Sequence, residues 1–486
     1  MEKVPKKIQN IIKTIEKAGF EAYLVGGCMR DLLRDQKPKD WDVATNAKPE
    51  KIESLFEKTF LDNKFGTVKV RVESKDESLK EVEITPYRID EKYSDKRHPD
   101  KIKWTDDIKE DLARRDFTIN AIAGRLNKSK LEIIDPYSGQ KDIEKKIVKA
   151  VGDPKERFSE DSLRMMRAVR FASVLGFKIE KETEKAIKEN APWLQAISKE
   201  RIRDELMKII MCPRAAEGVD VLRETGLLKY IIPELLEGYE VDQNKHHIYD
   251  CYEHSILSLK YAAKKGFNKY VRLAALLHDV GKPRSKEGEG EDATFYSHEI
   301  IGAKMTAQIM ARLKFSKKDI EKVVKLVRYH LFYYNVGEVS ESSVRRLVRK
   351  VGLGNVEELL QVRMADRIGS GVPKAEPYKL RHLKYVVEKV SRDPISAKML
   401  KIGGKEIMDI LNEKPGPKVG WVLDILLGEV LTDPSKNNKK NLLKRVKELS
   451  KLKDKELQKK AFEAKKEREE IETKKDKMTK KKYWVT

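Results

Sequence analysis

Two aspartates near the N-terminus form the most informative chemical pattern in the chain. Asp40 and Asp42 flank a single residue at a short predicted strand, residues 41–44, and side chains two positions apart on a strand point to the same face. Two carboxylates on one face can hold hard divalent cations such as Mg²⁺. An aspartate pair alone is common in proteins, so the residues that precede it decide what it means.

A glycine turn precedes the pair. The segment EAYLVGG reads as a short buried strand that runs into Gly26 and Gly27, and CMRDLLR then has helical composition. Backbone amides of such a turn could cradle phosphates, with Arg30 one helical turn further on to meet their charge. Together these features indicate chemistry on phosphates with divalent cations bound beside them.

A second group of metal-binding residue types lies between residues 247 and 366. Five segments there, each on or beside a helical pattern, contain histidine or aspartate: HIYDCYEHSILSL, AALLHDVGKPRS, FYSHEIIGA, VRYHLFY and ADR. A lone helical histidine is usually a packed or exposed residue, whereas the consecutive His278 and Asp279 with these companions favour a metal centre. Nitrogen and carboxylate ligands suit Ni, Mn, Fe or Zn better than Ca.

The elements that must position these residues change in type along the chain. Residues 1–150 combine an amphipathic helix that ends at Gly19, short strands, and a helix that starts at Pro49. From Asp153 onward the periodicity is helical almost everywhere. The sequence therefore predicts an α+β fold, with a mixed-sheet head followed by an all-α neck, body and tail. We expect five regions: a catalytic head at 1–150, a helical neck at 151–240, the histidine-bearing domain at 241–370, a helical body or tail at 371–435 and a Lys-rich extension at 436–486.

Charge points to a polyanionic partner. The 486 residues are 38% charged and 40% hydrophobic, and the net charge is +23. A surplus of this size favours nucleic acid through counterion release, the alternative being a solubilising surface rich in Lys and Glu. The last 51 residues hold 20 basic and 9 acidic side chains, so +11 of the surplus lies there. We expect this stretch to be an extended helix or a disordered arm, either in contact with phosphates or simply solvated.

Cysteine usage and hydropathy predict the compartment. Cys28, Cys212 and Cys251 are too far apart for a zinc knuckle and odd in number for a disulfide framework. The N-terminal helix lacks the unbroken apolar core of a signal peptide, and no window approaches 18 apolar residues. These features predict a cytoplasmic chain with no membrane span.

Several motifs of the first half resemble those of a known family. GGxxRD followed by DxD resembles the head of the nucleotidyltransferases related to DNA polymerase beta, and more narrowly the group of class II tRNA nucleotidyltransferases and bacterial poly(A) polymerases. DLARRDFTINAIA at 111–123 is similar to the head motif RRDFTxNA, and IIDPYSGQKDI at 133–143 resembles the segment that follows it. FSEDSLRMMRAVRFASVLGF at 158–177 resembles the neck helix that selects the incoming base.

This resemblance implies a role for each matching residue. Asp40 and Asp42 would bind Mg²⁺ and Glu83 would be an additional acidic position, unless it is an ordinary exposed strand residue. On the neck helix Asp161 would accept from the Watson–Crick edge of a base and Arg164 would donate to it, with Glu160 on the same side. The alternative for this helix is simple stabilisation by ion pairs three residues apart. The remaining nucleotide-binding positions are Gly26, Gly27, Arg30, Arg115, Arg167 and Arg170.

The histidine-bearing region resembles an HD domain. His278 and Asp279 in LLHDVGK match its central motif, His254 and Asp366 match the outer metal ligands, and His298 with His330 match the positions that complete a two-metal site. The resemblance implies metal-assisted hydrolysis of a phosphate ester. A structural remnant of such a domain is the alternative.

The combined prediction is an enzyme that adds CCA to the 3′ end of tRNA from CTP and ATP. A poly(A) polymerase would share the head motifs, but NKFGTVKV stands where such enzymes carry a basic run. Two further alternatives are an enzyme that adds only the terminal A and an HD phosphohydrolase with an RNA-binding head. The polar segment 88–107 is predicted to be a mobile loop, resembling one that distinguishes A-adding members from CC-adding ones.

Overall fold

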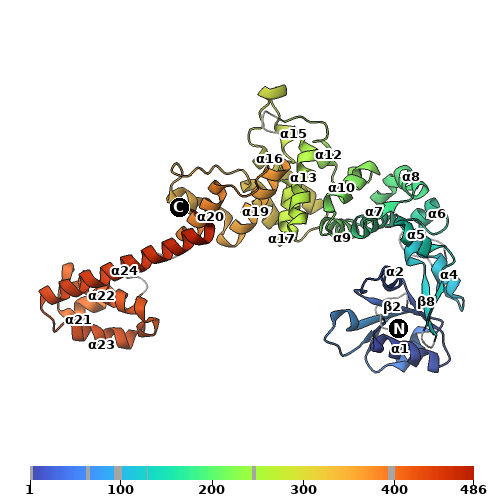
Figure 1. Cartoon of the computed structure of the whole chain (residues 1–486), viewed down its shortest axis with the longest axis horizontal. Coiled ribbons are helices and arrows are strands. Elements are labelled where there is room, and N and C mark those ends of the chain that lie inside the picture. Colours follow the sequence, from blue (N-terminus) through green and yellow to red (C-terminus); the bar gives the residue numbers. More distant parts are fainter. Residues whose placement is uncertain (1–3, 62–65, 92–100, 128–129, 244–247, 392–399) are drawn as a thin grey trace. The chain divides into compact units, whose positions relative to one another are not determined.

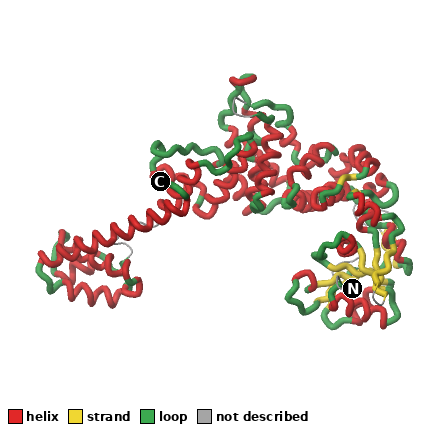
Figure 2. The backbone as a smooth tube through the Cα atoms, in the orientation of Figure 1, coloured by secondary structure: helices red, strands yellow, loops and turns green. Residues whose placement is uncertain are grey.

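The computed structural model describes residues 4–61, 66–91, 101–127, 130–243, 248–391 and 400–486. The described chain forms two compact units, one of residues 1–331 with 357–375 and one of residues 332–356 with 376–486. Strands gather near the N-terminus and helices make up the remainder, which confirms the predicted α+β fold (Figures 1 and 2).

A mixed seven-stranded sheet forms the head, in the order β3-β4-β5-β2-β1-β8-β9. The pair β2 and β5 is parallel and the other neighbours are antiparallel. The strands are β1 (Ala22–Val25), β2 (Trp41–Thr45), β3 (Thr59–Leu61), β4 (Val68–Arg71), β5 (Glu81–Pro86), β8 (Ala123–Asn127) and β9 (Lys130–Ile134), and the helices are α1 (Lys6–Lys17), α2 (Gly27–Leu33), α3 (Pro49–Leu55), α4 (Ile108–Ala113) and α5 (Gly139–Lys145).

Buried apolar side chains hold the strands of the head in place. All four residues of β1 are buried, and the isoleucines of α1 at positions 8, 11, 12 and 15 are buried on one face. Trp41, at the start of β2, is 1% exposed. The strand that carries Asp42 is therefore anchored by a large apolar side chain directly beside the carboxylate, which fixes the direction of the acidic residue.

The segment predicted to be a mobile loop is structured at both ends. β6 (Arg88–Glu91) pairs antiparallel with β7 (Lys101–Trp104), while residues 92–100 lie outside the described residues. The prediction missed the alternation in β7, where Ile102 and Trp104 are half-buried and the two lysines are exposed. Such a period of two is what a strand with one covered face requires.

The rest of the first unit is helical apart from the short parallel pair β10 (Ile147–Val148) and β11 (Lys178–Ile179). The helices that matter for the site are α6 (Pro154–Glu160), α7 (Leu163–Leu175), α9 (Lys199–Ile210), α13 (Cys251–Lys264), α14 (Lys269–Leu277), α16 (His298–Arg312), α17 (Lys317–Tyr329) and α19 (Leu353–Gly369). Between them lie α8 (Lys181–Asn190), α10 (Ala215–Glu224), α11 (Leu228–Ile231), α12 (Pro233–Leu236) and α15 (Lys282–Ser285).

The second unit contains α18 (Glu341–Val351), α20 (Tyr378–Ser391), α21 (Gly404–Leu411), α22 (Pro417–Thr432), α23 (Lys439–Leu449) and α24 (Asp454–Tyr483). The Lys-rich end of the chain is thus helical, and it is not a free arm. Leu457 and Ala461 of α24 are buried in a core shared with α22, and Tyr385 of α20 donates to Asp476 at 2.6 Å. No helix in the described ranges is long and apolar enough to cross a bilayer.

Candidate active site and metal centre

One cavity of about 480 Å³ lies between the head and the neck helices. It brings together ten residues that the sequence nominated: Gly26, Gly27, Arg30, Asp40, Asp42, Arg115, Asp161, Arg164, Arg167 and Arg170. The wall also contains residues that were not nominated, namely Arg114, Asp116, Asn120, Leu163, Phe171 and Arg201. Seven arginines face four aspartates in this lining, so the cavity suits a ligand of several negative charges such as a triphosphate.

Gly26 is needed for two reasons. Its φ is +69°, a conformation that side chains disfavour, and a Cβ there would lie 3.1 Å from Nη1 of Arg115 and 3.2 Å from Oδ2 of Asp42. Gly27 begins α2, and a Cβ there would make only ordinary contacts. The first glycine therefore lets the backbone pass close to the charged floor of the cavity.

Crowding of carboxylates perturbs Asp42. Burial and the neighbouring carboxylates of Asp40 and Glu83 raise the pKa of Asp42 to about 7. Asp42 and Glu83 face each other across the parallel pair of β2 and β5, and Glu83 also lies 3.4 Å from Nζ of Lys69. A divalent cation bound at Asp42 and Asp40 would relieve this repulsion.

The neck departs from the predicted single helix. Asp161 has extended backbone angles and separates α6 from α7, so Glu160 and Asp161 do not lie on one helix face with Arg164. The reason is local: the Asp161 carboxylate accepts from the backbone N–H of Leu163 at 3.1 Å, as residues at helix N-termini do. Because of this break, Asp161 lines the cavity. It does not do so by standing three residues before Arg164 on one continuous helix, as the sequence suggested.

Asp161 and Arg164 are each held by other partners. Arg201 grips Asp161 with two hydrogen bonds, of 2.7 and 3.3 Å, while Arg164 pairs with Glu160 and donates to the carbonyl of Arg114 at 3.2 Å. The sequence did not nominate Arg201, because nothing in the spacing between residues 161 and 201 signals a contact. Arg201 belongs to the segment ERIRDEL of α9 and lies on the side of that helix that faces the cavity.

Carboxylates also hold Arg167 and Arg170 in position. Arg167 makes two hydrogen bonds to Asp116, at 2.8 and 2.5 Å, and Arg170 donates to Glu205 at 2.6 Å. Although burial opposes it, the charges of Arg167 and Arg164 lower the pKa of Asp116 to about 2. Arg170 also lies 3.9 Å from the ring centroid of Phe171. Guanidinium groups fixed on one side by carboxylates give the cavity a preorganised positive wall.

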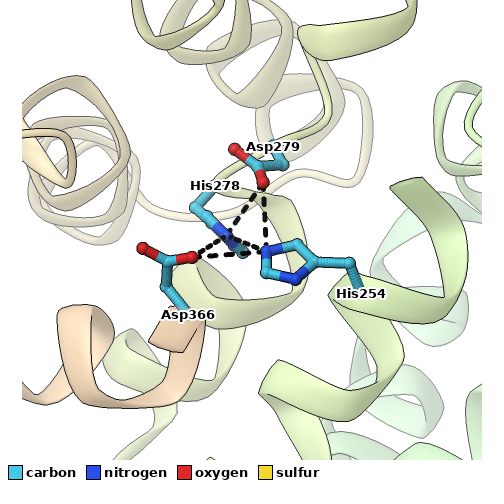
Figure 3. Close-up of side chains that lie close together, drawn as sticks. All are labelled: His254, His278, Asp279 and Asp366. Carbon is cyan, nitrogen blue, oxygen red and sulfur yellow. Dashed lines mark hydrogen bonds and ion pairs between the residues drawn. The ribbon is translucent and has the colours of Figure 1, made fainter. Parts of the chain in front are cut away.

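A second site is buried among the HD helices. Nε2 of His254 lies 2.9 Å from Nε2 of His278, and both nitrogens lie 3.1 to 3.2 Å from Oδ2 of Asp279 (Figure 3). Oδ1 of Asp366 completes the group at 3.4 and 3.7 Å from the same nitrogens. Ligands held at about 2.1 Å from one ion lie roughly 3 to 3.5 Å apart, so these four atoms fit one divalent metal.

Asp279 faces a second group with its other oxygen. Oδ1 of Asp279 is buried, makes no hydrogen bond of normal geometry among the described residues, and lies 3.3 Å from Nε2 of His298 and 3.5 Å from Nε2 of His330. The ligand atoms of these three residues all lie within 4.8 Å of one another. The carboxylate of Asp279 can therefore bridge two ions, and all six residues matched to an HD domain are assembled in one place.

Backbone carbonyls orient three of the imidazoles. Nδ1 of His278, His298 and His330 lies 2.7 to 2.9 Å from the carbonyl three residues earlier in each case. Because Nδ1 donates to this carbonyl, Nε2 is the nitrogen that can bind a metal, once any proton on it is displaced. Burial opposes charge on His278, yet Asp279 and Asp366 raise the pKa of His278 to about 10. The carboxylates of Asp279 and Asp366 thus favour a positive charge beside them.

Comparison with known proteins identifies the family of this chain. The family model of the poly(A) polymerase head domain matches residues 22–149, that of a probable RNA- and SrmB-binding site of polymerase A matches 176–238, and that of the HD domain matches 251–370. The CCA-adding enzyme of Limosilactobacillus reuteri (strain DSM 20016) is 32% identical over 448 residues, which cover 91% of this chain and 96% of that protein. This chain belongs to the CCA-adding enzyme family.

Other members of the family also align with this chain. The CCA-adding enzyme of Lactobacillus helveticus is 44% identical over 222 residues, so the alignment spans 46% of this chain and about half of that relative, 54%. Among solved structures, the Bacillus stearothermophilus CCA-adding enzyme in complex with CTP aligns with a TM-score of 0.60 and 27% identity, covering 91% of this chain and 96% of that one. CCA-adding enzymes are nucleotidyltransferases, and this chain is an enzyme of that class.

Proposed function

We propose that this enzyme adds CCA to the 3′ end of tRNA, taking the nucleotides from CTP and ATP. The observation that carries the proposal is the cavity in which Asp40 and Asp42 face a wall of fixed arginines. When bound at the two aspartates, Mg²⁺ would lower the pKa of the attacking 3′ hydroxyl and neutralise the departing pyrophosphate. Membership of the CCA-adding enzyme family supports the substrates named here.

The protein's own residues supply position and selectivity. Arg115, Arg167 and Arg170 would hold the triphosphate, since their guanidinium groups line the cavity and are fixed by Asp111, Asp116 and Glu205. Asp161 would accept from the amino group that cytosine and adenine share, and Arg164 would donate to a ring acceptor. Uracil and guanine reverse this donor and acceptor pattern at the same edge, so fixed side chains can reject them without a template.

One assay tests this proposal against its rivals. The protein is incubated with tRNA lacking its 3′ end and with CTP, ATP or both, and the product ends are sequenced. Addition of CCA supports the proposal. Addition of A alone to tRNA ending in CC indicates an A-adding enzyme, a long run of A indicates a poly(A) polymerase, and no addition leaves a phosphohydrolase with an RNA-binding head.

A second activity, metal-dependent hydrolysis of phosphate esters, is supported by the buried cluster around Asp279. Two groups of ligands share this carboxylate, and a cavity of about 340 Å³ reaches Asp279, His298, His330 and Asp366. The donor set favours Ni, Mn, Fe or Zn. Hydrolysis of a phosphomonoester or a 2′,3′-cyclic phosphate by protein loaded with Ni²⁺ or Mn²⁺ tests it, with metal analysis of the same sample as the second readout.

The three cysteines bear on the compartment. Cys28, Cys212 and Cys251 are buried and form no disulfides. This supports the cytoplasm, where tRNA is processed, as the place where the enzyme works.

A further inference from the structure

Arg272, in the middle of α14, is a buried cation that meets no carboxylate among the described residues. It is 5% exposed, and its guanidinium donates only to backbone carbonyls. Nη1 donates to Ile210 and Cys212, both at 3.0 Å, Nε donates to Phe267 at 2.8 Å, and Nη2 lies 3.5 Å from the carbonyl of Ala263. Burial lowers the pKa of Arg272, as expected for a guanidinium that has lost water without gaining a counter-ion.

These carbonyls lie at the ends of two helices. Ile210 ends α9 and Cys212 lies just beyond it, while Ala263 is in the last turn of α13 and Phe267 follows that helix. The last carbonyls of a helix have few donors within the helix and carry the negative end of its dipole, although that of Ala263 also accepts from the N–H of Gly266 at 3.0 Å. A single arginine therefore supplies both the donors and the positive charge to two helix ends, and it joins α9 to α13.

The other half of α9 reaches the nucleotide cavity. Arg201, in the first turn, grips Asp161, and Glu205, one turn later, binds Arg170. In Figure 1 α9 runs beside α7, which carries Arg164 and Arg170. A helix of 12 residues is a stiff rod of about 18 Å, so the fixed position of one end sets the position of side chains near the other.

The helices on the far side of Arg272 carry the metal ligands. His254 lies in the first turn of α13, and His278 and Asp279 follow the last residue of α14 directly. Arg272 does not line the nucleotide cavity. It stands between α9, whose Arg201 binds Asp161, and the two helices that build the HD site, so α9 is a direct link from Arg272 to Asp161.

We propose that Arg272 is a positioning residue for nucleotide selection: by fixing the C-terminal end of α9 against α13 and α14, it keeps Arg201 in register with Asp161. The inference rests on the proposed role of Asp161 and Arg164 in choosing the base. Without Arg272, the end of α9 loses the two hydrogen bonds that join it to α14, and only apolar packing then fixes its position. Asp161 then loses its fixed direction, and the penalty for a wrong base edge falls.

The test compares single-nucleotide addition to tRNA lacking its 3′ end, with CTP and UTP as separate substrates. Arg272→Met keeps most of the apolar stem and removes every donor, and we expect the ratio of kcat/KM for CTP over UTP to fall about tenfold. Arg272→Lys keeps the charge but cannot reach two helix ends, so an intermediate fall is expected. Arg312→Met is the control, because it removes an arginine from the same unit whose guanidinium pairs with Glu234 of α12.

A double-mutant cycle separates positioning from a general loss of structure. If Arg272 acts through Arg201, then Arg272→Met adds no further loss of selectivity in the background of Arg201→Ala. Equal losses in both backgrounds, or an unchanged ratio in a folded Arg272 variant, overturn the inference. If Arg272→Met does not fold, the same cycle with Arg272→Lys decides. Absence of any addition by the parent enzyme would instead overturn the proposed function, so the two failures are distinct.

Discussion

The nucleotide cavity and the buried HD cluster both depend on aspartates, but their surroundings treat those aspartates in opposite ways. In the cavity, burial and the neighbouring carboxylates raise the pKa of Asp42. In the HD cluster, histidines and Lys282 lower the pKa of Asp279 far below its usual value although the residue is buried. The first site leaves the Asp42 carboxylate beside those of Asp40 and Glu83, although Asp116 and Asp161 pair with arginines there. The second site surrounds Asp279 and Asp366 with nitrogen.

This difference indicates two uses of metal. A site with repelling carboxylates and an open mouth suits an ion that arrives with the triphosphate and leaves with the pyrophosphate. A site whose ligands are preoriented by backbone carbonyls and almost fully buried suits an ion that stays bound. The predictions below test whether the two sites can be broken separately, starting with the largest expected effect.

Loss of a cavity aspartate should have the largest effect. Asp40→Ala or Asp42→Ala should lower nucleotide incorporation at least about a hundredfold, because each removes a proposed Mg²⁺ ligand, while tRNA binding and tightly bound metal are unchanged. Glu83→Gln should cost less than about tenfold, since Glu83 is already paired with Lys69 and does not line the cavity. Rates of incorporation at saturating tRNA check both, and a cavity-aspartate variant with more than a tenth of parent activity contradicts the assignment.

Loss of Asp279, which both groups of candidate metal ligands share, should affect only the HD site. Asp279→Asn should remove bound transition metal and the hydrolysis of phosphate esters, with CTP incorporation unchanged, as measured by elemental analysis and the two assays on one preparation. His330→Ala should remove only the ion between Asp279, His298 and His330, halving the metal content. Equal metal content in His330→Ala and the parent would show that a single ion binds.

Base selection should be affected more moderately. Arg164→Ala should lower the preference for CTP and ATP over UTP and GTP about tenfold while the rate with CTP falls less, because its proposed contact is with the base edge and not with the reacting phosphate. Arg201→Ala should have a similar effect by releasing Asp161. Competition between labelled CTP and unlabelled UTP measures both. Unchanged preference in Arg164→Ala would show that the neck arginine serves only to pair with Glu160.

The sequence predicted which residues lie in the cavity better than it predicted their contacts with one another. Asp40, Asp42 and the six residues of the HD site could be found because their chemistry is local or their motifs are distinctive. The pairing of Asp161 with Arg201 could not be found, because it joins residues 40 positions apart on separate helices. The expected helix through Glu160 and Asp161 was wrong because Asp161 has extended backbone angles, and its carboxylate binds the N–H of Leu163 and the distant Arg201.

The smallest expected effect is on stability, and it follows from the crowded carboxylates. The pKa of Asp42 is raised from 3.8 to about 7 in the folded protein, so between these values the folded state holds a proton that the unfolded chain has lost. The stabilising contribution of protonated Asp42 is therefore complete below pH 4 and is lost as the pH rises to 7. Above pH 7 the ionised carboxylate destabilises the metal-free head.

Asp42→Asn removes this penalty because the amide cannot ionise. For a half-buried carboxylate we expect a gain of about 1 to 2 kcal/mol at pH 8, seen as a Tm a few degrees higher, and a smaller gain at pH 5. Saturating Mg²⁺ should reverse the order at pH 8, since it binds the parent site and not the amide. Asp106→Asn, at an exposed position before α4, is the control and should leave Tm unchanged at both pH values. A parent protein as stable as Asp42→Asn at pH 8 without metal would mean that the arginines of the cavity already neutralise Asp42, and the contrast between the two sites would then lie in access to solvent and not in charge.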